Sequence, residues 1–280
     1  MKDYRIAVDS CTEMNEKMRS DPHVVKVPLT LRLGNTEVVD DDSFDQASFL
    51  KMIAESPDGP SSACPSPQAF MDAFGSDDCD AYAITLSAEL SGSYNSAMQA
   101  KKMLQEDMPR KNIHVFNSRS AAAGQSLVLM KLQECLAAGM PFKDVVVEVE
   151  LYIREQTTLF VLETLEVFRK NGRLSNLKAA VVEVLNLKPV MGSTPAGTIK
   201  QVGKGRGMKK ALTVLVDHIG ETAIRSKEKA LAIVHCNCMN RARWLKHEIE
   251  QRYDFKKIVI LEAGGVSTTY ACDGGIIVAY

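Results

Sequence analysis

Short apolar runs alternate with polar turns and amphipathic segments along the first half of the chain. Apolar strands are predicted at 5–8, 81–86 and 112–116, and small polar residues follow each of them. Helical spacing of apolar residues follows at 97–104 and from about 121 to 138. Strands that alternate with helices are typical of parallel sheets. The pattern therefore predicts an α/β fold whose N-terminal part is a parallel sheet flanked by helices.

Between these units the pattern predicts smaller elements. The apolar, β-branched segment 24–33, the turn at 34–35 and the segment 36–39 indicate a hairpin or two short strands. Asp42 and Ser43 are expected to cap a helix that ends near 57–60. The loop 61–67 leads into the next helix, with Ser66 as its cap and Pro67 at its first position.

The second half is predicted to be a separate α/β domain with a mixed sheet. A helix at 141–156 bridges to it, so we place the N-terminal domain at 1–156 and the C-terminal domain at 157–280. Its expected strands are 158–162, 188–191, 198–202, 230–235, 257–261 and 275–278. Its expected helices are 165–170, 177–184, 208–219 and 239–253. The glycine-rich stretch 203–207 is interpreted as a flexible turn.

Composition narrows the function classes. The 280 residues carry a formal net charge of −1, which argues against a nucleic acid partner. The N-terminus does not resemble a signal peptide, and no apolar run is long enough to span a bilayer, so we expect a cytoplasmic protein. The seven cysteines are irregularly spaced and are expected to be reduced thiols.

The stretch 86–98 is the strongest candidate for a binding site. A buried strand ends there, and a small polar turn with Ser91, Gly92 and Ser93 opens a helix. The unpaired N–H groups of a helix N-terminus, together with the serine hydroxyls, favour an anion such as a carboxylate or a phosphate. The alternative is that Ser91 or Ser93 only caps the helix.

Other chemistry finds little support in the sequence. The 203–207 stretch has neither the spacing of a dinucleotide-binding fingerprint nor the Gly-Lys-Ser/Thr of a P-loop. His235, Cys236 and Cys238 lack a second ligand pair, so we expect no metal site. The Gly-x-Ser-x-Gly motif is absent around Ser91, which disfavours a serine hydrolase. A cysteine nucleophile at Cys11, Cys64 or Cys272 stays open.

Six short motifs, in order along nearly the whole chain, resemble the DegV family of bacterial fatty-acid-binding proteins, which includes the carrier subunit of fatty acid kinase. The first three are Asp9-Ser10-Cys11-Thr12, Ser62-Ala63-Cys64-Pro65-Ser66-Pro67 and Leu90-Ser91-Gly92-Ser93-Tyr94. The others are Leu162-Glu163-Thr164-Leu165, Asn171-Gly172-Arg173-Leu174-Ser175 and Leu185-Asn186-Leu187-Lys188-Pro189-Val190.

The resemblance implies a long-chain fatty acid in a tunnel between two domains. It implies that Ser62 and Ser91 hold the carboxylate, with backbone N–H groups of Gly92 and Ser93. Tyr270 stands where the family has a histidine, and Asp273 follows it in place of the family's proline. Arg206 occupies the position of an arginine that is implicated in kinase docking. Candidate tunnel residues are Leu159, Val161, Leu162, Leu165, Phe168, Leu185 and Leu187.

From these features we expect a carrier that is not itself an enzyme and has no cofactor. It would present the fatty acid carboxylate to a separate ATP-dependent kinase. Uncharged donors are expected to anchor the carboxylate, and the buried chain to supply most of the affinity. The alternative is a small-molecule transferase or hydrolase that uses the same hydroxyl-rich pocket.

Overall fold

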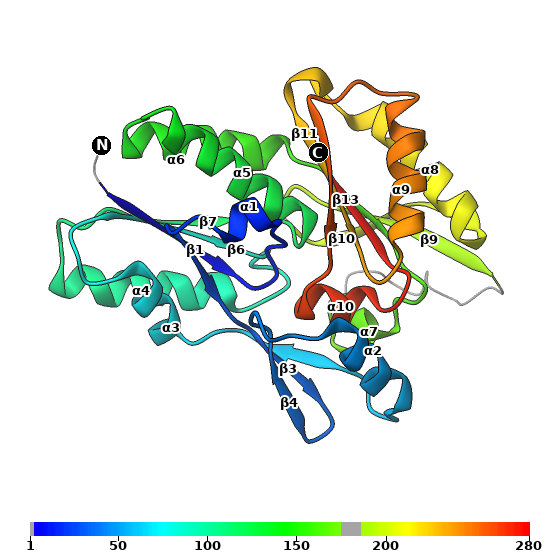
Figure 1. Cartoon of the computed structure of the whole chain (residues 1–280), viewed down its shortest axis with the longest axis horizontal. Coiled ribbons are helices and arrows are strands. Elements are labelled where there is room, and N and C mark those ends of the chain that lie inside the picture. The colour runs from blue at the N-terminus through cyan, green and yellow to red at the C-terminus, as the bar shows by residue number, and fades with distance from the viewer. Residues whose placement is uncertain (1–2, 175–185) are drawn as a thin grey trace.

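The computed structural model describes residues 3–174 and 186–280 and shows an α/β protein built on two main sheets. The first sheet is parallel, in the order β2 (Val24–Val27), β1 (Tyr4–Asp9), β6 (Asp80–Thr85), β7 (Ile113–Asn117). The helices α3 (Pro67–Phe74) and α4 (Ser93–Asp107) cover one face. The other face is covered by α5 (Ala123–Ala137) and α6 (Phe142–Glu155) (Figure 1). This confirms the predicted N-terminal sheet and its flanking helices.

The second sheet is mixed and lies beside the first (Figure 1). Its order is β10 (Ile199–Arg206), β9 (Leu187–Ser193), β8 (Thr158–Val161), β13 (Ile276–Ala279), β11 (Ala230–His235), β12 (Lys257–Glu262). Only β11 and β12 are paired in parallel within it. The two sheets lie on either side of residue 156, and the division of the chain into two domains at that residue stays a prediction.

The two faces of the second sheet have different roles. One packs on α8 (Gly207–Thr222) and α9 (Met239–Glu250). The other packs against α5 and α7 (Glu166–Lys170), and so faces the N-terminal half. Along β8, Leu159 and Val161 point toward α8, whereas Phe160 packs on the opposite face because side chains alternate along a strand.

A small antiparallel sheet, which the sequence pattern did not predict as a unit, lies beside the junction. It is formed by β4 (Thr36–Val39), β3 (Thr30–Leu33) and β5 (Ser61–Ala63), and it includes the hairpin that the turn at 34–35 indicated. Next to it lie α2 (Gln46–Glu55) and α10 (Gly265–Ala271) (Figure 1). The remaining short elements are α1 (Glu16–Arg19) and a 3-10 turn, Ser226–Glu228.

Three local predictions are corrected or left untested. Asp45, rather than Asp42 or Ser43, caps α2, because its carboxylate accepts the N–H groups of Ala47 and Ser48. The 203–207 stretch is not a flexible turn: residues 203–206 end strand β10, and Gly207 begins α8. A Cβ on Gly205 would lie 2.3 Å from the backbone of Ala211, so glycine lets α8 approach the strand closely. The helix expected at 177–184 lies outside the described residues.

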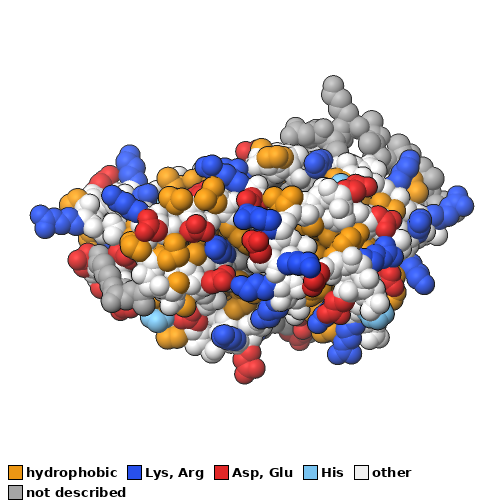
Figure 2. All heavy atoms as spheres, turned by 90° about the horizontal axis from the view of Figure 1, so that it is seen from above, with side chains coloured by type: hydrophobic (Ala, Val, Ile, Leu, Met, Phe, Trp, Pro, Cys, Tyr) orange, Lys and Arg blue, Asp and Glu red, His pale blue; other side chains and the backbone are white. Residues whose placement is uncertain are grey.

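The surface carries mixed charge. On the face in Figure 2, basic and acidic side chains are interspersed, and no region of one sign dominates. All seven cysteines are free thiols, as the sequence indicated. Within the described residues, no helix combines the length and the apolar character needed to cross a membrane.

Candidate functional site

A cavity lies where the two main sheets and the small sheet meet. Its empty volume is about 820 Å³, a figure that includes space open to solvent. Its lining is mostly apolar and comes from both halves of the chain. It includes Leu29, Leu86, Phe160, Leu162, Phe168 and Ile199. An apolar cavity of this kind suits an apolar ligand.

A row of aromatic rings runs along one wall toward a polar end. Phe160 stacks on Phe168 with ring centroids 5.7 Å apart, and Phe168 packs on Tyr270 at 5.0 Å. The Tyr270 hydroxyl then lies 3.2 Å from Ser62 Oγ. The wall therefore changes from apolar to hydrogen-bonding over the length of three side chains.

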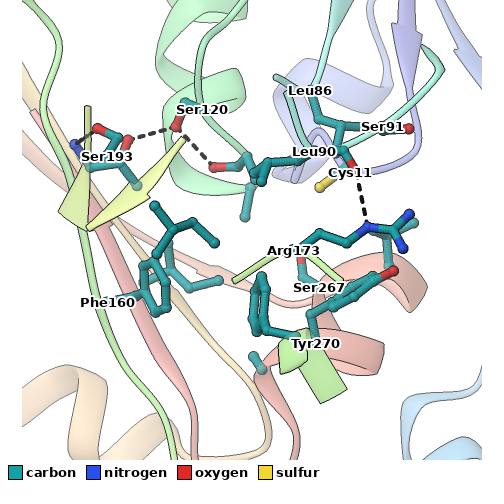
Figure 3. Close-up of a pocket in the computed structure, with 18 of the residues that line it drawn as sticks. Cys11, Leu86, Leu90, Ser91, Ser120, Phe160, Arg173, Ser193, Ser267 and Tyr270 are labelled. Carbon is teal, nitrogen blue, oxygen red and sulfur yellow. Dashed lines mark hydrogen bonds between the residues drawn. The ribbon is translucent and has the colours of Figure 1, made fainter. Parts of the chain in front are cut away.

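The structure brings three of the predicted carboxylate-binding residues together. Ser62 from β5, Ser91 from the turn before α4 and Tyr270 from α10 all line the cavity. In Figure 3, Ser91 and the Tyr270 hydroxyl lie on the same side of the cavity. Their use in binding a carboxylate stays a prediction, because the structure holds no ligand.

Ser93 and Gly92 lie behind this end and do not line the cavity. Ser93 is fully buried, with its Oγ 3.2 Å from Ser91 Oγ, and its N–H donates to Ser91 Oγ at the same distance. Gly92 is the N-cap residue of α4 and makes no side-chain cap bond. A Cβ on Gly92 would lie 2.8 Å from Cys64 Sγ, so glycine permits the close contact of the two loops.

Arg173 is the residue that sequence reasoning missed. It lines the cavity, and its Nε donates to the carbonyl oxygen of Leu90 at 3.2 Å, which holds it beside Ser91 (Figure 3). A second hydrogen bond links its guanidinium to the Asn171 carbonyl. This end, where only uncharged donors were expected, therefore also carries a guanidinium. A guanidinium can form charge-assisted, bidentate hydrogen bonds to a carboxylate.

Two buried carboxylates fix the position of α10, which carries Tyr270. Asp40 accepts the N–H groups of Gly265 and Val266 at 2.8 and 2.9 Å. Glu13 Oε2 accepts the N–H of Gly264 at 2.9 Å. Burial raises the pKa of Glu13 to about 8 and also raises the pKa of Asp40. The start of α10 is thus tied to the segment that follows β1 and to the residue that follows β4.

Asp9, from the first motif, supports the site from outside the cavity. It is fully buried, and its two oxygens accept the N–H of Leu86 at 2.8 Å and Nε2 of Gln125 at 2.7 Å. Burial raises its pKa to about 6. Asp9 therefore links two segments: Leu86, at the start of the turn that contains Ser91, and Gln125 of α5.

The lining offers little for nucleophilic catalysis. Among the described residues that line the cavity there is neither a histidine nor a carboxylate to act as a base. Cys11 does line it, but burial raises the pKa of its thiol well above the ordinary value, so the thiol stays protonated near neutral pH.

The other candidates lie elsewhere. Arg206 is exposed at the end of β10 and does not contact the cavity. Asp273 is exposed, and its carboxylate accepts a hydrogen bond from Asn237 Nδ2 at 3.0 Å, so it is turned away. Of the candidate tunnel residues, Leu162 and Phe168 line the cavity, whereas Leu159 and Val161 face α8. Leu165 and Leu187 are not in the lining, and Leu185 lies outside the described residues.

Residues 3–280 match the family model described as "Uncharacterised protein, DegV family". The chain belongs to the DegV family. A DegV domain-containing protein of Streptococcus pyogenes serotype M18 is 31% identical over 279 residues, which cover 99% of each chain.

Solved DegV structures share the fold over nearly the full length. A protein of Ruminococcus gnavus, described with vaccenic acid, is 46% identical with a TM-score of 0.95 and 99% coverage of both chains. The fatty acid kinase (Fak) B3 protein of Streptococcus pneumoniae, loaded with linoleic acid, is 30% identical with a TM-score of 0.91 and the same coverage. A DegV protein of Eubacterium eligens, loaded with heptadecanoic acid, is 29% identical with a TM-score of 0.90; the alignment covers 99% of this chain and 98% of that one.

Proposed function

We propose that this protein binds a long-chain fatty acid in the cavity, with the carboxylate at the end formed by Ser62, Ser91, Arg173 and Tyr270. The observation that carries the proposal is the apolar cavity, which has hydrogen-bond donors and a guanidinium gathered at one end. The fatty acids in the related structures, one of them from a chain 46% identical to this one, support it.

The energetics of the lining fit such a ligand. Burying a sixteen-carbon chain contributes about 0.8 kcal/mol per methylene, on the order of 10 kcal/mol before the costs of ordering. A buried carboxylate is unfavourable unless it is hydrogen-bonded. Arg173 supplies charge-assisted bonds, and Ser62, Ser91 and Tyr270 supply hydroxyl donors, so the head group fixes the orientation of the chain.

A head-group series tests this proposal. Delipidated protein is titrated with palmitic acid, palmitic acid methyl ester and hexadecanol, each in competition with a fluorescent fatty acid. We expect palmitic acid to bind roughly 10- to 100-fold more tightly than the other two, because only the carboxylate forms charge-assisted bonds. Equal affinity for all three would contradict the polar end as the carboxylate site, and failure of all three to bind would contradict fatty acid binding altogether.

We further propose that the bound fatty acid is presented to a separate kinase, with Arg206 in the docking surface. The similarity to the pneumococcal fatty acid kinase B3 protein supports this step, and Arg206 is exposed and separate from the cavity. With a bacterial fatty acid kinase subunit and ATP, we expect acyl phosphate that hydroxylamine traps as the hydroxamate. Arg206→Ala is expected to lower that yield and leave fatty acid affinity unchanged, whereas exposed Lys51→Ala lowers neither. Equal yields from both variants would remove Arg206 from the docking surface.

A further inference from the structure

The end of the cavity opposite Arg173 is polar as well. In Figure 3, Ser120 and Ser193 lie across the apolar middle from Arg173 and Tyr270. Thr158 joins them in the lining, and Ser120 and Thr158 are more than nine-tenths buried, at 4% and 6% exposure. Hydroxyl groups thus gather at the end of the cavity opposite the proposed carboxylate site.

The hydrogen bonds of these hydroxyls leave capacity for a ligand. Ser120 Oγ lies 2.6 Å from Thr158 Oγ1, and it donates to the Ala121 carbonyl at 3.3 Å. Ser193 Oγ accepts the Thr158 N–H at 3.2 Å, a bond that uses a lone pair of Ser193 and not its proton. A hydroxyl has one proton to donate and two lone pairs. Ser193 can therefore donate to an oxygen that enters the cavity and accept from it.

The space beyond this end is polar too. A second hollow, with an empty volume of about 720 Å³ that includes open solvent, shares Arg119, Thr158 and Ser193 with the cavity. It is lined by polar side chains that include Ser118, Thr194, Lys200 and His218. A methyl group placed at this junction would meet hydroxyls and gain less from burial than it would in an apolar pocket.

We propose that the preferred ligand is a long-chain fatty acid with a hydroxyl group at or near the end distant from its carboxylate, and that Ser193 and Thr158 bind this hydroxyl. The inference rests on the proposed function. A neutral hydroxyl suits this end better than a second carboxylate does, since a buried carboxylate needs a cation. The guanidinium of Arg119, a residue that lines both hollows, already donates to the Pro195 carbonyl at 3.3 Å.

Competition among four acids of one chain length tests the proposal. Delipidated protein is titrated with palmitic, ω-hydroxypalmitic, α-hydroxypalmitic and hexadecanedioic acid. We expect ω-hydroxypalmitic acid to bind on the order of 3- to 10-fold more tightly than palmitic acid, because its terminal hydroxyl forms one or two additional hydrogen bonds. The α-hydroxy isomer, which has the same composition with the hydroxyl beside the carboxylate, is expected to lack that advantage.

Two variants locate the effect. Ser193→Ala and Thr158→Val should bring the ratio of the ω-hydroxypalmitic to the palmitic affinity close to one while palmitic acid still binds. The matched surface controls Ser48→Ala and Thr36→Val should keep the wild-type ratio. Binding of palmitic acid in the two cavity variants also shows that they are folded.

The outcomes separate this inference from the proposed function. If none of the four acids binds, the proposed function fails. If palmitic acid binds at least as tightly as ω-hydroxypalmitic acid, only the hydroxylated ligand is ruled out. If hexadecanedioic acid binds most tightly, the far end is a second carboxylate site and the assignment of a hydroxyl is overturned.

Discussion

Ser62 Oγ lies 3.2 Å from the hydroxyl oxygen of Tyr270, although 208 positions separate the two residues in the chain. The contact joins β5 of the small sheet to α10, and both residues line the cavity. Tyr270 thus brings a hydroxyl group to the end of the cavity that Ser62 also lines.

Removing the serine hydroxyls should weaken fatty acid binding. We expect Ser62→Ala combined with Ser91→Ala to raise the dissociation constant for palmitic acid roughly 10-fold or more, because two donors to the carboxylate are lost. Fluorescence competition measures it. The double variant Ser43→Ala and Ser48→Ala, on the exposed region around the start of α2, serves as the control. An unchanged constant in the cavity variant would mean that the head group lies elsewhere.

Loss of the guanidinium should have a larger effect than loss of a hydroxyl. Arg173→Met keeps much of the side chain's length but removes the charge. We expect the affinity for palmitic acid to fall roughly 10- to 100-fold, because a charge-assisted hydrogen bond to the carboxylate is lost. Arg169→Met removes the same charge from an exposed position on α7. If both variants bind as the wild type does, Arg173 does not contact the carboxylate.

The capping of α10 by Asp40 should matter for stability and for binding alike. Asp40→Ala leaves the N–H groups of Gly265 and Val266 without their acceptor, and we expect a loss of about 1–3 kcal/mol in the free energy of unfolding. Fatty acid affinity should also fall, because α10 positions Tyr270. Urea unfolding and fluorescence competition measure the two effects. Asp42→Ala, on an exposed neighbour, should change neither quantity.

Glu13 should make the folded protein less stable as pH rises. Its pKa is about 8 in the folded protein against an ordinary value of 4.5, so the folded state holds a proton that the unfolded chain releases. The stability it contributes is fully present below about pH 4.5 and is lost as pH rises toward 8. The glutamine side chain of the Glu13→Gln variant is uncharged at every pH. We therefore expect the urea midpoint of this variant to fall less than that of the wild type between about pH 5 and pH 8. Exposed Glu16→Gln is the control. Parallel pH profiles for Glu13→Gln and wild type would contradict this linkage.

Much of the fold could be predicted because strand and helix periodicities are local. Strands β1, β6 and β7, the flanking helices and the strands of the mixed sheet are indicated by runs of apolar residues. Segment 24–27, which was expected to belong to a hairpin, instead pairs with β1 in the parallel sheet. The helix α10 was missed because Val266, Thr268 and Thr269 have low helix propensity. It forms because the Asp40 and Glu13 carboxylates accept the N–H groups at its start, and this is a tertiary effect.

The site could be predicted only in part, because contacts between distant segments of the chain also determine it. Ser62, Ser91 and Tyr270 were selected from short motifs, and the structure places all three on one cavity. Leu159 and Val161 were selected as tunnel residues without regard to the alternation along β8, which turns them toward α8. Arg173 lay within a quoted motif, but its place beside Leu90 depends on packing between segments 83 positions apart.

Native mass spectrometry of the protein purified from cells tests the central claim most directly. We predict that a fraction of the protein carries one added mass equal to that of a long-chain fatty acid. We expect this adduct to be lost when Arg173→Met is combined with Ser62→Ala. A wild-type protein that shows only the mass of the bare chain, both as purified and after incubation with palmitic acid, would contradict the account.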